Sequence, residues 1–280
     1  MEIGIFARTF ARPTAEEVFD AVVAAGIPAI QFNWLSAGLD PLPGSIDDRI
    51  IQQVSQAAAD RNLQIASVSG TFNMIHPDPA VRVDGLERLT AVMESARKLG
   101  SPVVTLCTGT RDPVDMWRNH PDNATDAAWT DLLTVMAPAV AKAEEIGVVL
   151  GVEPEVNNVV SSPAKARQLL DTIQSSHLGI IMDGANVFPK GGLNRQHEIL
   201  DNAFALLGDD IVLAHAKDTS RDGDAGHEAA GTGLLDYNYY VKLMLQSSYD
   251  GPLVLHSLSE AQVPGCVAFL QEKLEQAGEG

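Results

Sequence analysis

Short apolar runs rich in β-branched residues recur along the chain, and each of them ends in Gly, Pro or polar residues. Runs of this length and composition are typical of buried strands. After each run, apolar positions recur at the spacing of a helix, so strands and helices are expected to alternate. The eight candidate strands cover residues 2–7, 29–34, 64–70, 103–109, 148–155, 178–184, 211–218 and 253–258.

Amphipathic stretches between these runs predict helices, with clear examples at residues 14–25, 83–99, 126–146 and 164–175. Pro163 stands near the start of the last of them and Gly147 directly follows the third, and these residue types favour such helix boundaries. Alternating strands and helices indicate a parallel sheet, and eight parallel strands close a barrel. The sequence therefore predicts an α/β fold, a single (β/α)8 TIM barrel, as one domain over residues 1–280.

A doubly wound open sheet would also alternate strands with helices. Such a sheet usually carries a Gly-rich phosphate-binding turn after its first strand, whereas Ala7-Arg-Thr-Phe10 follows the first strand here. The longer irregular segments, 110–123 and 219–232, both follow strands, where a barrel builds its active-site loops. The ends of the strands are therefore the place to look for function.

The balance of charges narrows the range of partners. The chain has a formal net charge of -18 and a sequence pI of about 4.6, which argues against binding a nucleic acid through a broad basic surface. Nowhere do about 18 consecutive apolar residues occur, so we expect no membrane partner. The two cysteines, Cys107 and Cys266, form no CxxC pair, which favours a reducing cytoplasm.

Ionisable residues end the last four candidate strands. Glu153, Asp183, His215 and His256 stand there, and consecutive strands of a closed barrel bring such residues to one point at its mouth. A carboxylate in an apolar strand needs a partner, and a shared cation would serve. Two carboxylates and two imidazoles suit a borderline ion, so we expect one divalent ion, Mn²⁺ first, with Zn²⁺, Co²⁺ or Fe²⁺ as alternatives. The alternative is four separately hydrogen-bonded polar groups.

Residues two apart on a strand share a face, so Lys217 is expected beside His215, and Glu155 beside Glu153. An amine next to an ion can polarise a carbonyl or move a proton. The alternative is that Lys217 forms a structural salt bridge with Glu155 or Asp218.

Aromatic and imidazole side chains on the mouth loops are candidates for substrate binding. Trp34 ends the second candidate strand, His76 follows the third and Trp117 follows the fourth. Such side chains can stack on a sugar ring or bind its hydroxyls. The alternative is that they pack within their own loops.

Several motifs, in order, resemble one known family. They are VEPE, IIMD and LAHAKD at three strand ends, then GTGLLDY and YDGPLV further on. Together they resemble the sugar phosphate isomerase/epimerase superfamily, the xylose isomerase-like TIM barrels, over essentially the whole chain. The resemblance implies a divalent ion, often Mn²⁺ or Co²⁺, held by a Glu, Asp, His, Glu set. Three of these correspond to Glu153, Asp183 and His215, whereas His256 stands where the family usually has Glu.

The resemblance also implies roles in catalysis and substrate binding. In the 3-epimerases of the family, two ion-bound glutamates remove and return a proton on opposite faces of the sugar. Here Glu153 is the candidate base, with Lys217 or His256 returning the proton, and Asn186 stands where many relatives have a substrate-binding histidine. Many relatives are dimers or tetramers, which makes a homo-oligomer an expectation for this chain.

The leading hypothesis is thus an ion-dependent isomerase or epimerase acting on a sugar, keto sugar or polyol derivative by proton transfer next to a carbonyl. Three alternatives remain open from the residues alone. They are an inosose dehydratase-like lyase, a metal-dependent hydrolase, and a barrel that binds a sugar without catalysis.

Overall fold

Eight parallel strands close into a barrel in the computed structural model, which describes residues 1–278. Consecutive strands pair from β1 to β7, β7 pairs with β9, and β9 pairs back with β1. The strands are β1 (Ile3–Phe6), β2 (Ala29–Phe32), β3 (Gln64–Ser69), β4 (Val103–Leu106), β5 (Val149–Val152), β6 (Leu178–Asp183), β7 (Ile211–Asp218) and β9 (Leu253–Leu255). The predicted (β/α)8 TIM barrel is confirmed; residues 279 and 280 of the predicted domain lie outside the described part.

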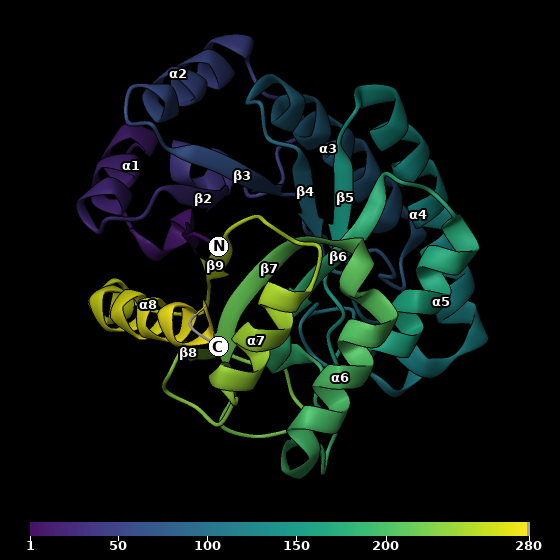
Figure 1. The fold of residues 1–280 in the computed structure, drawn as a ribbon. Helices are drawn as coiled ribbons and strands as arrows, with labels where there is room; N and C mark the ends of the chain where they lie inside the picture. Colours follow the sequence, from purple (N-terminus) through teal and green to yellow (C-terminus); the bar gives the residue numbers. More distant parts are fainter. Residues whose placement is uncertain (279–280) are drawn as a thin grey trace.

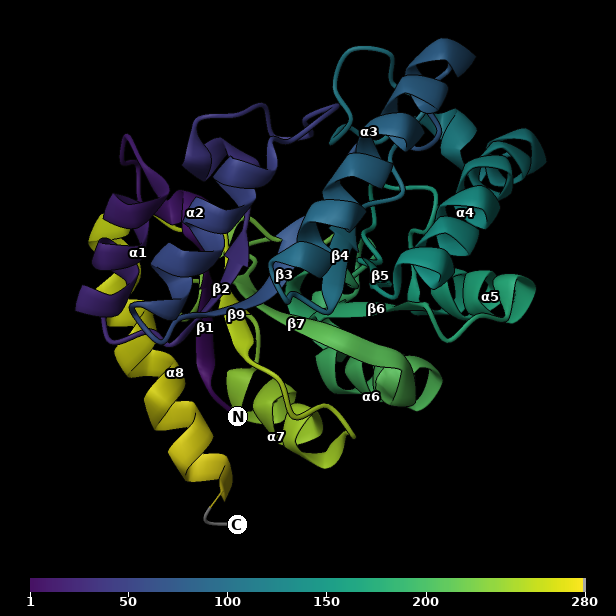
Figure 2. The ribbon, with the colours of Figure 1, turned by 90° about the horizontal axis from the view of Figure 1, so that it is seen from above.

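Helices surround the barrel in the order of the chain (Figures 1 and 2). They are α1 (Ala15–Ala24), α2 (Asp48–Ala59), α3 (Pro79–Lys98), α4 (Asp126–Ile146), α5 (Pro163–Ile173), α6 (Gln196–Leu207), α7 (Tyr237–Gln246) and α8 (Val263–Gly278). A two-residue strand, β8 (Glu228–Ala229), pairs antiparallel with the end of β7. Within residues 1–278, no helix has the length and apolar character needed to cross a membrane.

Helix boundaries follow the local signals in the sequence. Pro163 is the first residue of α5, after the N-cap Ser162, and Gly147 caps the end of α4 with a φ of 80°. α3 begins earlier than the predicted residue 83, because the Asp78 carboxylate accepts a hydrogen bond from the Ala80 N–H and Pro79 takes the first helical position.

Seven of the eight strands end earlier than predicted, and in two of them this sets the position of a site residue. β5 ends at Val152, and Pro154, which lacks an N–H, follows two residues later. β9 ends at Leu255, and Ser257 then adopts a left-handed φ of 57°, which no strand contains. Glu153 and His256 therefore each stand directly after a strand rather than within it.

The long segment after β7 is attached to the barrel by the buried Asp218 carboxylate. Its Oδ1 accepts hydrogen bonds from the N–H groups of Thr219 and Leu235, and its Oδ2 accepts one from Gly231. Gly233 passes so close that a Cβ there would lie 2.4 Å from Asp218 Oδ1. This part of the GTGLLDY motif is therefore explained by packing of the chain around one carboxylate.

We expect Gly233→Ala to destabilise the protein by about 2 kcal/mol or more, because the new methyl group displaces Asp218 from its backbone donors. Gly265→Ala is the matched control, since nothing lies within 4 Å of the added atom and the site is an exposed helix position. Urea unfolding of both variants measures the difference. Equal stabilities would show that the loop accommodates the methyl group and that Asp218 does not constrain it.

Candidate metal centre and active site

A polar layer lies directly above the apolar interior of the barrel. Ile181, Leu213 and Val254 pack together inside it with Ala66. Two residues further along their strands come Asp183, His215 and His256, which alternation places on the same side. The strand register sets Asp183 beside His215, and His215 beside Val254.

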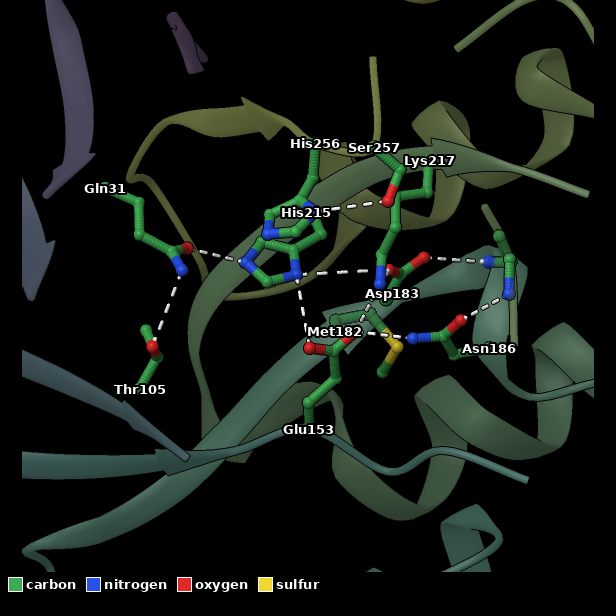
Figure 3. A network of polar contacts seen from close by, with 12 residues as sticks. Gln31, Thr105, Glu153, Met182, Asp183, Asn186, His215, Lys217, His256 and Ser257 are labelled. Atoms are coloured by element: carbon green, nitrogen blue, oxygen red, sulfur yellow. Dashed lines mark hydrogen bonds and ion pairs between the residues drawn. The ribbon is translucent and has the colours of Figure 1, made fainter. Parts of the chain in front are cut away.

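Glu153, Asp183 and His215 form a cluster whose ligand atoms all lie within 4.8 Å of one another. His215 Nδ1 is 3.5 Å from Glu153 Oε2 and 3.9 Å from Asp183 Oδ2 (Figure 3). The side chains of His215 and Asp183 are buried, and that of Glu153 is 14% exposed. Three of the four residues expected to share an ion therefore meet at the carboxyl end of the barrel.

Each member of the cluster has one polar atom held by the protein and one left facing the others. Asp183 Oδ1 accepts the Ala185 N–H, and Glu153 Oε1 accepts from the Asn186 side-chain amide. His215 Nδ1 is buried without a hydrogen-bond partner among the described residues, and the buried Asp183 Oδ2 forms an ion pair with the Lys217 ammonium group at 2.9 Å. Two oxygens and one imidazole nitrogen facing a common point fit a divalent ion of the borderline class. The cluster can hold a metal ion.

Gln31 on β2 determines how His215 is presented. Its side-chain oxygen lies 2.8 Å from His215 Nε2, and its amide nitrogen donates to the hydroxyls of Ser69 and Thr105. Because an amide oxygen can only accept, Nε2 carries the proton and Nδ1 keeps its lone pair toward the carboxylates. Sequence reasoning missed Gln31, although a single polar residue in the apolar run Ala-Ile-Gln-Phe was a signal for it.

Lys217 bridges the two carboxylates. Its ammonium group is 2.9 Å from Glu153 Oε1 and 2.9 Å from Asp183 Oδ2, and its side chain is 7% exposed. Lys217 therefore lies on the inward face beside His215, as expected. The alternative pairing of Lys217 with Asp218 is excluded, because that carboxylate binds backbone N–H groups.

The charges in this layer shift the pKa values of its members. Burial tends to raise the pKa of Glu153, but Lys217 and His215 outweigh it and hold that pKa well below its usual range. Burial raises the pKa of Asp183 to about 6, although Lys217 opposes the change. Burial tends to lower the pKa of Lys217, and Asp183 and Glu153 outweigh it and raise that pKa. Lys217 is therefore charged, and Glu153 is its ionised partner.

Glu155 is a buried carboxyl group close to this layer, and its pKa is shifted in the opposite direction to that of Glu153. It is 4% exposed, and its Oε1 accepts a hydrogen bond from the Asn158 side chain. Burial, followed by repulsion from Glu153, raises the pKa of Glu155 to about 7. A carboxyl group that is half protonated near neutral pH can donate as well as accept a proton.

His256 lies beside the cluster and is not one of its three close ligands. Its ring stacks on Phe6 with centroids 4.5 Å apart, lies 5.0 Å from the ring of His215, and places Nδ1 3.2 Å from Ser257 Oγ. Desolvation, followed by the charge of Lys217, lowers its pKa well below the usual value, so the ring is neutral. Its predicted role as the fourth ligand stays a prediction.

The residues predicted to bind substrate have separate places in the structure. Trp34 does not reach the mouth, because its side chain is wholly buried and its Nε1 donates to Ser95 on α3. In this structure the indole packs the barrel wall against α3, and its predicted contact with substrate stays a prediction.

His76 and Trp117 lie on the loops after β3 and β4. The His76 ring contacts the Pro113 carbonyl and accepts the Asp78 N–H, so it ties the two loops together. Trp117 is 52% exposed on the second loop. Asn186 is wholly buried and joins Glu153 to the Gly226 N–H of the segment after β7. Asn186 therefore orients the candidate base in this structure.

Comparison with known proteins identifies the family. The sequence model of the xylose isomerase-like TIM barrel family matches residues 19–273, so the chain belongs to that family. No curated protein sequence matches it.

Solved structures with the same fold share few of its residues. The apo form of 3-keto-D-glucoside 4-epimerase, YcjR, from E. coli is 18% identical with a TM-score of 0.74, over 97% of this chain and 99% of that one. An L-ribulose 3-epimerase is 19% identical with a TM-score of 0.76, over 99% and 96%. The IolI protein with a bound zinc atom is 14% identical with a TM-score of 0.76, over 99% of each chain.

We expect Gln31→Leu to weaken binding of Mn²⁺ or Zn²⁺ about 10- to 100-fold, because His215 loses the acceptor that fixes its tautomer. Calorimetric titration measures the affinity, and the ¹⁵N shifts of His215 report which nitrogen carries the proton. Gln53→Leu, on the exposed face of α2, is the control. An unchanged affinity together with an unchanged tautomer would contradict the role given to Gln31.

We expect the stability of the ion-free protein to respond to pH through Glu155. Its folded-state pKa is raised from 4.5 to about 7, so the folded protein binds more protons than the unfolded chain across that window. Stability from this group is therefore lost as the pH rises through the window. Between pH 5 and pH 8, the free energy of unfolding of Glu155→Gln should therefore rise by about 2 to 3 kcal/mol relative to that of the wild type. Urea unfolding at both pH values measures it, with Glu87→Gln as the control; parallel pH curves would contradict the raised pKa.

Proposed function

We propose that this protein is a sugar isomerase or epimerase that works with one divalent ion held by Glu153, Asp183 and His215. The observation that carries the proposal is the convergence of these three ligand atoms at the mouth of a xylose isomerase-like barrel. The similar structures named as 3-keto-D-glucoside 4-epimerase and L-ribulose 3-epimerase support a keto sugar or sugar derivative as the substrate class. Mn²⁺ is the proposed ion, with Zn²⁺, Co²⁺ and Fe²⁺ as alternatives.

When bound, the ion supplies Lewis acidity toward adjacent oxygens of the substrate. Glu153 takes the proton from the carbon next to the carbonyl, since its lowered pKa keeps it ionised and its side chain is the most exposed of the three ligands. The Lys217 ammonium group donates a hydrogen bond to the oxygen on which negative charge develops. Both groups start in contact, 2.9 Å apart.

Return of the proton determines the product. His256 follows β9 while Glu153 follows β5, so the two groups approach the site from different sectors of the barrel. A neutral imidazole delivers a proton only after it has accepted one, so His256 must first take up a proton from solvent. Return to the other face of the same carbon by His256 gives epimerisation, and return to the neighbouring carbon gives isomerisation.

A lyase of the inosose dehydratase type is the second candidate. The observation that favours it is the charged Lys217 next to the candidate base, because an ammonium group can give its proton to a departing hydroxyl. Loss of water from the substrate would distinguish this reaction from a rearrangement.

We expect Glu153→Gln to lower turnover about 100- to 10,000-fold, because the amide cannot accept the substrate proton. The assay incubates Mn²⁺-loaded protein with a panel of keto sugars and ketone polyols in D₂O, and proton NMR follows deuterium entering next to the carbonyl. Metal analysis of each preparation separates loss of the base from loss of the ion.

Glu87→Gln on the exposed surface of α3 is the matched control for this assay. Unchanged exchange in Glu153→Gln with a substrate that the wild type turns over would remove Glu153 from the mechanism. Deuterium uptake with no loss of water supports the isomerase or epimerase, and loss of water supports the lyase.

A further inference from the structure

One oxygen atom in the candidate metal centre serves two cations. Asp183 Oδ1 accepts the Ala185 N–H, and Oδ2 is the oxygen of this side chain that faces His215 Nδ1 at 3.9 Å. The same Oδ2 lies 2.9 Å from the ammonium nitrogen of Lys217. A metal ion that binds Asp183 through Oδ2 must therefore share this oxygen with Lys217 or displace it.

Glu153 divides its two oxygens in a similar way. Oε1 receives both Lys217 and the Asn186 amide, whereas Oε2 faces His215 Nδ1 at 3.5 Å. The metal position and the ammonium position are thus neighbours. Asp183 Oδ2 borders both of them, and the two oxygens of Glu153 face one position each. Figure 3 shows Lys217 and His215 converging on the same two carboxylates.

The backbone holds Lys217 in this place. Lys217 pairs with Ala229 of β8, and the Lys217 carbonyl accepts a hydrogen bond from the buried Tyr237 hydroxyl at 2.7 Å. Its side chain is 7% exposed, and those of Asp183 and Glu153 are 0% and 14% exposed. A charged amine in such surroundings loses much of its stabilisation when it leaves the carboxylates, so it stays beside them.

We propose that Lys217 is a resident counter-cation of the metal centre, which keeps Glu153 and Asp183 together in the ion-free protein and lowers their affinity for a divalent ion. The inference rests on the ion site of the proposed function and extends it to how tightly the ion is held. Two like charges that share an oxygen repel each other strongly at low dielectric. The repulsion makes the bound ion exchangeable, and the ammonium group keeps the empty site folded.

The two effects of removing the charge have opposite signs. Without Lys217, two buried carboxylates repel each other in the ion-free protein, which loses stability. The same carboxylates then bind a divalent ion without competition, so its affinity rises. A lysine whose role is confined to proton transfer would change neither quantity in this paired way.

The test compares Lys217→Met with Lys217→Gln, Lys217→Arg and the wild type, after treatment with a chelator. Calorimetric titration with Mn²⁺ and with Zn²⁺ gives the dissociation constants, and thermal unfolding gives the stability with and without each ion. Lys242→Met, on the exposed surface of α7, is the matched control. Lys217→Gln covers the case in which the Met variant does not fold without an ion, and Lys217→Arg keeps the charge.

We expect the Met and Gln variants to bind both ions at least tenfold more tightly than the wild type and to unfold at a lower temperature without ion. Added ion should then raise their unfolding temperature more than that of the wild type, as mass action requires. Lys217→Arg should stay close to the wild type in both measurements.

Affinities that are unchanged or weaker in both neutral variants would overturn the inference. In that case the proposed function stands, provided that the wild type binds an ion and depends on Glu153. If neither the wild type nor the variants bind Mn²⁺ or Zn²⁺, the ion site is wrong and the inference falls with it.

Discussion

Two carboxylates at the mouth of the barrel, Glu153 and Asp183, must have a cation between them, and much of the surrounding structure follows from this constraint. Lys217 supplies one positive charge at 2.9 Å from each of them. His215 Nδ1 is left without a hydrogen-bond partner in the described chain, and it faces the two carboxylates at a point where a divalent ion fits. Because unpaired buried charges are costly, these side chains stay together only while at least one cation is present.

The groups around the cluster orient it. Gln31 fixes the tautomer of His215 from the opposite side of the ring, and Asn186 holds Glu153 while its other end binds the segment after β7. Asp218, next to Lys217, is fully occupied by backbone N–H groups of that same segment. The end of β7 that carries Lys217 is therefore held in place by hydrogen bonds from the segment that follows it.

The family and the site together limit the chemistry. The chain belongs to the xylose isomerase-like TIM barrels, and Glu153, Asp183 and His215 form a cluster that can hold a metal ion, with the His256 ring beside it. The neutral His256 ring stacks on Phe6 and lies 5.0 Å from the ring of His215, so the titratable group beside the cluster is an imidazole and not a carboxylate.

The sequence by itself determined the barrel, its strands and the residues at their ends. Periodicity assigns a residue to a face of its own strand, and the order of parallel strands then places Asp183, His215 and Lys217 at one mouth. This information is local, and it was enough to predict three cluster residues and the lysine. Strand ends were less accurate, because Pro154 and the left-handed Ser257 end regular pairing before the apolar run stops.

Only the tertiary structure decided which side chains touch. Gln31 and His215 are 184 residues apart on β2 and β7, and their contact depends on the closure of the barrel. From the sequence, Lys217 could pair with several acidic residues. In the structure it forms ion pairs with Glu153 and Asp183, because Asp218 binds the segment after β7. Trp34 sits at a strand end like the site residues, yet it lies wholly buried against α3. Partner choice depends on distances set by strands far apart in the chain, which no local pattern contains.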